Sequence, residues 1–199
     1  MIQNEIENAR RSLPCGITAK VNSLVDPEII ELLYQASTAG VPVRLIVRGI
    51  CCLIPGKPGI SENITVRSIV GRLLEHSRIF LFENAGKQKV FLGSADWMPR
   101  NLDRRVELIF PVEEDVLKQR VLRILERMLA DNENARVMGP DGTYARVDRR
   151  GKAPVSCQTE FMRMAAEAVR KRKEQTSALP FEPIRSADTQ PQNRERTEE

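Results

Sequence analysis

The chain has 199 residues, 41% of them hydrophobic and 29% charged, which is enough for one domain with a sizeable core. No apolar run approaches the roughly 20 residues that a membrane span needs, and the N-terminus lacks the apolar segment of a secretory signal. The sequence therefore excludes an integral membrane protein, and we expect a cytoplasmic one. A formal net charge of +4 indicates an anionic partner only where the cations cluster.

The cysteines and the histidine give little support to a metal site. Cys15, Cys51, Cys52 and Cys157 contain no CxxC pair, and the chain has a single histidine, His76. Zinc sites are built from several Cys and His ligands at short spacings. We therefore expect reduced thiols and no protein-bound metal.

The first part of the chain predicts a parallel strand–helix–strand unit. A helix is expected from Pro27 to about Thr38, because apolar residues recur there at helical spacing and Asn22, Ser23 and Asp26 offer caps. Strands in residues 16–24 and 41–47 flank it. Ligands usually sit at the carboxyl edge of parallel strands, so this edge, at Arg48 and Gly49, is the expected ligand side.

The remaining elements follow in chain order. A Gly- and Pro-rich stretch predicts a surface loop, β-branched and aromatic runs predict strands, and an amphipathic pattern predicts a long helix. The expected elements are a helix at 3–12, a loop at 51–63, strands at 64–70, 76–82, 89–95 and within 104–112, a helix at 113–129, polar turns at 130–153, and a helix at 155–173. The composition then turns polar, so we expect one domain at 1–174 and a disordered tail at 175–199.

Residues able to handle phosphate gather around the only histidine. His76 and Arg78 are two apart and are expected on one face of a strand, with Glu83 further along and Ser94 and Asp96 after the next strand. Histidine exchanges a proton near neutral pH, arginine grips phosphoryl oxygens at two points, and a carboxylate can orient the imidazole. The alternative from spacing alone is a half-exposed histidine without a role.

Two sequence patterns resemble known families. H-x-R-x4-E followed by GSAD is similar to the H-x-K-x4-D and G-S-x-N of phospholipase D-like phosphotransferases, with Arg in place of Lys and Glu in place of Asp. Longer segments resemble the C-terminal part of bacterial polyphosphate kinases over about residues 5 to 172. These segments are NSLVDPEIIELLYQASTAGVPVRLIVRGICCLIPG, GISENI, SIVGRLLEHSRIF, KVFLGSADWMPRNLDRRVE and LKQRVLRIL.

The kinase resemblance implies an α/β, phospholipase D-like fold, with a mixed or parallel sheet flanked by helices. It implies reversible transfer of the terminal phosphate of ATP to polyphosphate, with magnesium held through the phosphates and a phosphohistidine intermediate. By position, Arg48 matches an arginine that contacts nucleotide phosphates, His76 matches the second active-site histidine, and Asp96 is favoured as a site carboxylate. The phosphorylated histidine of the family belongs to the preceding catalytic domain, so a separate chain carrying that half is an expected partner.

Other functions stay open at this stage. The chain could be a catalytically silent polyphosphate-binding module, or a phospholipase D-like phosphodiesterase that pairs two copies around a twofold axis. Arg72, Arg100, Arg104 and Arg105 could extend a basic channel for polyphosphate, although for any one of them a solvated surface charge is the favoured interpretation. The basic stretch RKRK is favoured at a helix C-terminus by the helix dipole, so we do not expect nucleic acid.

Overall fold

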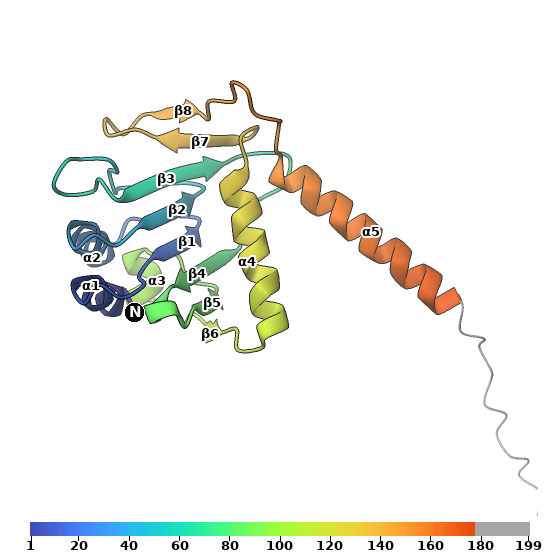
Figure 1. Cartoon of the computed structure of the whole chain (residues 1–199), viewed down its shortest axis with the longest axis horizontal. Helices are drawn as coiled ribbons and strands as arrows, with labels where there is room; N and C mark the ends of the chain where they lie inside the picture. The colour runs from blue at the N-terminus through green and yellow to red at the C-terminus, as the bar shows by residue number, and fades with distance from the viewer. Residues whose placement is uncertain (178–199) are drawn as a thin grey trace, which may run out of the picture. The chain divides into compact units, whose positions relative to one another are not determined.

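An eight-stranded mixed sheet forms the centre of the first of two structural units, residues Met1–Phe161 (Figure 1). The strand order is β6-β5-β4-β1-β2-β3-β7-β8. The strands are β1 (Ile17–Val21), β2 (Val43–Val47), β3 (Ile64–Ile69), β4 (Arg78–Phe82), β5 (Lys89–Gly93), β6 (Ile109–Pro111), β7 (Ala135–Met138) and β8 (Tyr144–Arg146). Strands β1, β2 and β3 are parallel, and all other pairs are antiparallel.

This computed structural model describes residues 1–177, with side chains to residue 174. The helices are α1 (Ile2–Arg10), α2 (Pro27–Thr38), the 3-10 turn η1 (Asn84–Gly86), α3 (Pro99–Asp103), α4 (Asp115–Ala130) and α5 (Cys157–Ser177). The second unit begins at Met162, and within it α5 carries ion pairs between Arg163 and Glu167 and between Arg170 and Glu174. No helix in residues 1–177 is both long and apolar enough to cross a bilayer.

Helices cover both faces of the sheet, because alternate strand residues bury their side chains on opposite sides. On one face, Ala19 and Leu45 pack in the same cluster as Leu33 of α2. On the other face, Ile79 packs in the same cluster as Leu125 of α4. Figure 1 shows α1 and α2 on one side of the strands and α4 on the other. The predicted α/β class, a mixed sheet flanked by helices, is confirmed.

The predicted strand–helix–strand unit is confirmed as β1, α2 and β2. The Asp26 carboxylate accepts a hydrogen bond from the Ile29 N–H at 3.0 Å, and Pro27 occupies the first turn of α2. Asp26 therefore caps the helix, whereas Asn22 and Ser23, which were also candidate caps, lie at the end of β1. Because β1 and β2 pair in parallel, their carboxyl ends meet at the same edge of the sheet.

Three sequence-based predictions need correction. The segment 130–153 holds not only turns but also β7 and β8, a hairpin whose turn contains Gly142 at a φ of 81°. Strand β4 begins at Arg78, so His76 lies in the preceding loop rather than in the strand. The strand expected within 104–112 is only three residues long.

The predicted boundary of the C-terminal tail is tested only in part. Helix α5 continues to Ser177, past the expected end of the helix at 173. The rest of the tail, residues 178–199, lies outside the described residues. The disorder predicted for it therefore stays a prediction.

Candidate functional site

Four strand ends converge on one edge of the sheet. Asn22 follows β1, Arg48 follows β2, Arg78 begins β4, and Asp96 lies just after β5. Strand β4 runs antiparallel to β1, and β5 runs antiparallel to β4, so these ends meet. They enclose a cavity of about 360 Å³. We name it the strand-end cavity. Its lining residues are Asn22, Ser23, Arg48, His76, Arg78, Ser94, Asp96, Arg100, Arg105 and Glu107.

Asp96 is the central acceptor of this cavity. Its Oδ2 accepts from Arg78 Nη2 at 2.9 Å, and its Oδ1 accepts from Arg78 Nε at 3.2 Å, a two-point ion pair. Oδ1 also accepts from the backbone N–H groups of Asn22 at 2.6 Å and Ser23 at 3.3 Å. Burial alone would raise the pKa of Asp96, but Arg78 and the Asn22 N–H outweigh it and hold the pKa below its ordinary value.

Arg78 joins this carboxylate to His76. Its Nη1 donates to the His76 carbonyl oxygen at 3.0 Å and lies 3.1 Å from the His76 imidazole Nδ1. A guanidinium N–H can only donate, so Nδ1 must accept, and the proton of the neutral ring then sits on Nε2. The imidazole side chain is exposed. His76 therefore presents an N–H group that is free to meet a ligand.

Arg48 is oriented by a separate contact. Its Nε donates to Asn22 Oδ1 at 3.0 Å, which turns the guanidinium at the end of β2 toward the same cavity. The Gly49 N–H donates to the Asn22 carbonyl oxygen at 2.7 Å. A Cβ at Gly49 would lie 3.0 Å from that oxygen, a tight contact that a larger residue could make only if the two backbones moved slightly apart. Asn22 Nδ2 is buried and has no hydrogen-bond partner.

The outer wall of the cavity comes from the segment around α3. Glu107 accepts hydrogen bonds from Ser94 Oγ and Asn101 Nδ2, and it lies 3.5 Å from Arg105 Nε. Both hydrogen bonds lower the pKa of Glu107, and the one from Ser94 has the larger effect. With Arg100 also in the wall, the cavity holds four arginines against two carboxylates.

The structure brings together most of the predicted site residues. Arg48, His76, Arg78, Ser94 and Asp96 all line the strand-end cavity. Of the four arginines predicted to extend a basic channel, Arg100 and Arg105 line the strand-end cavity, whereas Arg72 and Arg104 do not.

Glu83 is not among the residues that meet there. It follows the last residue of β4, at the opposite end from Arg78, and its carboxylate accepts from Gln88 Nε2 at 2.9 Å. The structure therefore removes Glu83 from the site. The carboxylate expected to orient His76 acts through Arg78 instead, and it is Asp96.

Three lining residues of the strand-end cavity were not predicted as site residues from the sequence, namely Asn22, Ser23 and Glu107. Asn22 and Ser23 lie near the carboxyl end of a predicted parallel strand, so the rule that ligands gather at carboxyl ends could have found them. Glu107 gave no such signal, because its place depends on how the segment after α3 returns to β5.

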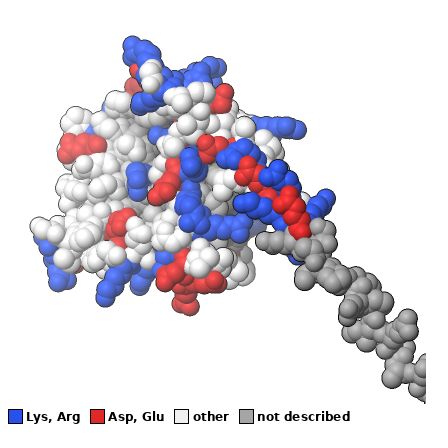
Figure 2. Space-filling view, turned by 45° about the vertical axis from the view of Figure 1, so that its right-hand side comes forward, with Lys and Arg blue, Asp and Glu red and all other residues white. Residues whose placement is uncertain are grey.

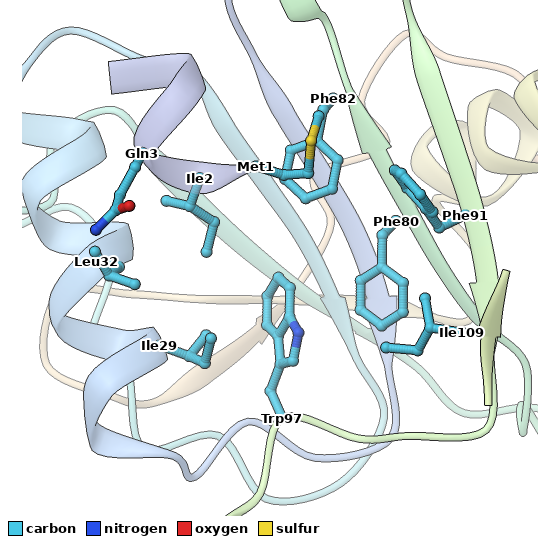
Figure 3. Close-up of a pocket in the computed structure, with 10 residues that line it drawn as sticks. All are labelled: Met1, Ile2, Gln3, Ile29, Leu32, Phe80, Phe82, Phe91, Trp97 and Ile109. Atoms are coloured by element: carbon cyan, nitrogen blue, oxygen red, sulfur yellow. The ribbon is translucent and has the colours of Figure 1, made fainter. Parts of the chain in front are cut away.

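A second cavity, of about 390 Å³, lies between α1, α2 and the sheet. Figure 3 shows the rings of Phe80, Phe82, Phe91 and Trp97 directed into it. We name it the apolar cavity. Its lining residues are Met1, Ile2, Gln3, Ile29, Leu32, Phe80, Phe82, Phe91, Trp97 and Ile109. None of these lining residues has a charged side chain, so the apolar cavity does not suit a phosphate.

The magnesium implied by the family does not fit a protein-built site here. Both carboxylates of the strand-end cavity are engaged, Asp96 by Arg78 and Glu107 by Ser94 and Asn101. Within the described residues, no group of three or more His, Cys, Asp or Glu side chains could hold a metal ion. A magnesium ion bound here would thus depend on oxygen atoms of a substrate.

Charges of both signs are mixed over the molecular surface in view. Figure 2 shows Lys and Arg side chains interspersed with Asp and Glu on that face.

The fold and the site define an α/β domain with a cationic cavity at its strand ends, and comparison with known proteins names the family. The family model described as polyphosphate kinase C-terminal domain 2 matches residues 1–158. The chain belongs to this family, as its sequence segments predict.

Polyphosphate kinases of known sequence are closely similar to this chain. That of Lactiplantibacillus plantarum is 52% identical over 169 residues, covering 85% of this chain and 24% of its own length. Polyphosphate kinase 1 of Chlorobaculum tepidum is 55% identical over 164 residues, covering 82% and 23%. The chain thus spans about a quarter of the length of these relatives.

A solved structure agrees with this assignment. The polyphosphate kinase of Porphyromonas gingivalis aligns with a TM-score of 0.80 at 42% identity, over 88% of this chain and 26% of that one. The similarity of fold thus extends over most of the chain.

Proposed function

We propose that this chain is the C-terminal catalytic half of a polyphosphate kinase, and that its strand-end cavity binds the phosphates of ATP and polyphosphate. One observation carries the proposal. Arg48 and His76, the two residues that the family resemblance assigns to nucleotide phosphates, line the same cavity although they come from different strand ends. The reaction would be the reversible transfer of the terminal phosphate of ATP to polyphosphate.

Arg48 is suited to neutralise the transferred phosphoryl group. Among the described residues 1–177, only its Nε is committed, to Asn22 Oδ1, so both terminal nitrogens can face two phosphoryl oxygens. Fixed cations at the place where charge develops stabilise a phosphoryl-transfer transition state without reorganisation.

His76 would act through its Nε2 atom. Since Nδ1 accepts from Arg78, Nε2–H can donate a hydrogen bond to a phosphoryl oxygen and stabilise the negative charge on it. Arg78 makes four hydrogen bonds to Asp96 and His76 out of five N–H donors, so it has one left for phosphate. We assign Arg78 mainly to holding His76, with Asp96 as its support.

The phosphorylated histidine of the reaction would come from another part of the kinase. The chain has one histidine, and we assign His76 the assisting role. A chain incubated with magnesium and ATP labelled on its terminal phosphate should therefore gain no acid-labile label. Near-stoichiometric label on His76 would contradict this assignment.

The single histidine also favours a second candidate, a polyphosphate-binding module without activity. The two candidates differ when the preceding catalytic domain of a relative is added to the chain. Restored synthesis of polyphosphate would support the kinase, whereas binding without synthesis would support the module.

The phosphate role of Arg48 can be tested by substitution. Arg48→Lys keeps the charge and loses the planar two-point grip, so affinity for ATP with magnesium should fall by about 1–3 kcal/mol. Titration calorimetry measures the affinity, and thermal unfolding checks the fold. Arg146→Lys on β8, exposed and away from the cavity, is the matched control. Unchanged affinity in Arg48→Lys would refute the proposed role.

A further inference from the structure

His76 sits on a segment that has no regular structure of its own. Residues 70–77 connect β3 to β4 without a helix or a strand. Val70, Leu73 and Leu74 of this segment, the His76 loop, are exposed at 68%, 47% and 70%. These exposed side chains do little to fix the His76 loop. Its position must therefore depend on contacts with buried residues.

Lys20 makes the first of these contacts. Its side chain rises from β1 and is 1% exposed. Nζ donates to the Ser77 carbonyl oxygen at 2.9 Å and lies 3.5 Å from Glu75 Oε2. Lys20 thus grips the residues on both sides of His76.

Gln158, in the first turn of α5, makes the second contact from the opposite side. Its Nε2 donates to Leu73 O at 2.9 Å and to Glu75 Oε1 at 2.7 Å, and its Oε1 accepts from Leu73 N–H at 2.8 Å. A Cβ at Gly71 would lie 2.6 Å from that Oε1, so a larger residue there would displace the Gln158 amide group. Glu75 therefore shares its two carboxylate oxygens between Lys20 and Gln158.

A buried ion pair of this kind is a poor means of stabilising a fold. Removing two charges from water costs several kcal/mol, and well-packed apolar residues often stabilise as well or better. Burial lowers the pKa of Lys20, Glu75 opposes this, and the nearby Arg48 and Arg78 lower the pKa further. Lys20 is thus close enough to two arginines of the strand-end cavity to feel their charge.

We propose that Lys20, Glu75 and Gln158 form a buried clamp that positions His76 for contact with phosphate. Lys20 is a positioning residue, since it acts through the backbone on either side of His76. This inference rests on the proposed function of the cavity, because it explains how His76 is kept there.

The single histidine makes the clamp directly observable. The imidazole Hε1 proton of His76 gives the only histidine signal in a proton–carbon NMR spectrum of the chain. The double variant Lys20→Met with Glu75→Gln removes both charges and leaves Gln158 an acceptor at residue 75. We expect its His76 signal to move toward the chemical shift of the unfolded chain. Lys89→Met, which removes an exposed lysine at the start of β5, should leave the signal unchanged.

Binding of tripolyphosphate separates positioning from a purely structural role. We expect His76→Ala to weaken binding about tenfold, and the clamp variant to weaken it by a similar factor. In the His76→Ala background, the clamp substitutions should then add less than about twofold. A stability role alone would lower the unfolding temperature and leave the affinity of the folded chain intact.

Each outcome decides the proposal. A folded clamp variant with the wild-type His76 signal and wild-type affinity would overturn it. If the clamp variant does not fold, Gln158→Leu, which loses the hydrogen bonds to Leu73 and Glu75, must show the same displaced signal. If the unmodified chain does not bind tripolyphosphate, the proposed function fails, while the His76 signal still decides the clamp.

Discussion

The strand-end cavity and the apolar cavity are nearly equal in volume, about 360 and 390 Å³, and opposite in chemistry. One is lined by four arginines, a histidine and two carboxylates, and the other by aliphatic and aromatic side chains. Volume therefore says little about which of the two handles phosphate. The polar groups that converge in the smaller cavity make it the candidate binding site.

Two neighbouring residues separate the cavities. Asp96 lines the strand-end cavity and binds Arg78, whereas Trp97 lines the apolar cavity and stacks near Phe80 with ring centroids 5.3 Å apart. Successive side chains of an extended chain point to opposite sides. The segment after β5 thus serves the binding site with one residue and the hydrophobic core with the next.

The largest expected effect is on stability, when Asp96 or Trp97 is replaced by alanine. Asp96→Ala leaves the largely buried Arg78 without its ion-pair partner and should lower the free energy of unfolding by about 3 kcal/mol. Trp97→Ala should cost a similar amount by leaving a void in the core. Urea unfolding measures both losses.

Binding of tripolyphosphate then distinguishes these two variants. Calorimetry under conditions where both are folded should show lost binding in Asp96→Ala and retained binding in Trp97→Ala. Equal binding by the two would contradict the division between the cavities.

Ionic strength should have the next largest effect. Polyphosphate bound by the four arginines of the strand-end cavity displaces counterions, so its affinity should fall roughly a hundredfold between about 50 and 200 mM salt. Fluorescence anisotropy of an end-labelled polyphosphate at several salt concentrations measures the slope. An affinity that does not respond to salt would place polyphosphate outside the cationic cavity.

A smaller effect is expected at Asn22, whose side chain orients Arg48. Asn22→Ala removes one hydrogen bond to a charged group and should weaken ATP binding by about 1.5 kcal/mol, near tenfold. Gln3→Ala, at an exposed residue of the apolar cavity, is the matched control and should leave affinity unchanged. Equal affinity in both variants would show that Arg48 does not need this contact.

The smallest effect concerns acid. The pKa of Asp96 is lowered in the folded chain, so its ion pair stabilises the fold above its ordinary value of 3.8 and is lost as the pH falls through the lower folded value. Stability should therefore drop below about pH 4, and less steeply in Asp96→Asn than in the unmodified chain. Unfolding midpoints in urea between pH 5 and 2 test this. Parallel curves would contradict a lowered pKa at Asp96.

Local pattern was sufficient to predict much of the fold. Helix α2 was predicted with its observed bounds, because its cap, its proline and its apolar spacing all lie within the segment itself. The parallel pairing of β1 with β2 followed from the helix between them. The hairpin of β7 and β8 escaped prediction, since strands of four and three residues carry too little alternation to stand out.

The candidate site shows the same division between local and distant information. Arg48, His76, Arg78, Ser94 and Asp96 were predicted from strand ends and family motifs. Arg78 and Glu83 were both predicted as site residues, and only Arg78 lines the strand-end cavity. Arg78 begins β4 and Glu83 follows its last residue, and only the pairing of β4 with its neighbours decides which end faces the cavity.

The sequence alone determined the α/β class, the family, and the residue types able to meet phosphate, because these depend on spacing and identity along the chain. Only the tertiary structure decided which charges meet. Asp96 binds Arg78 rather than His76, Asn22 turns Arg48, and Lys20 holds the loop around His76 from a buried strand. Such contacts join residues distant in sequence. They depend on strand order and register, which the packing of the whole sheet determines.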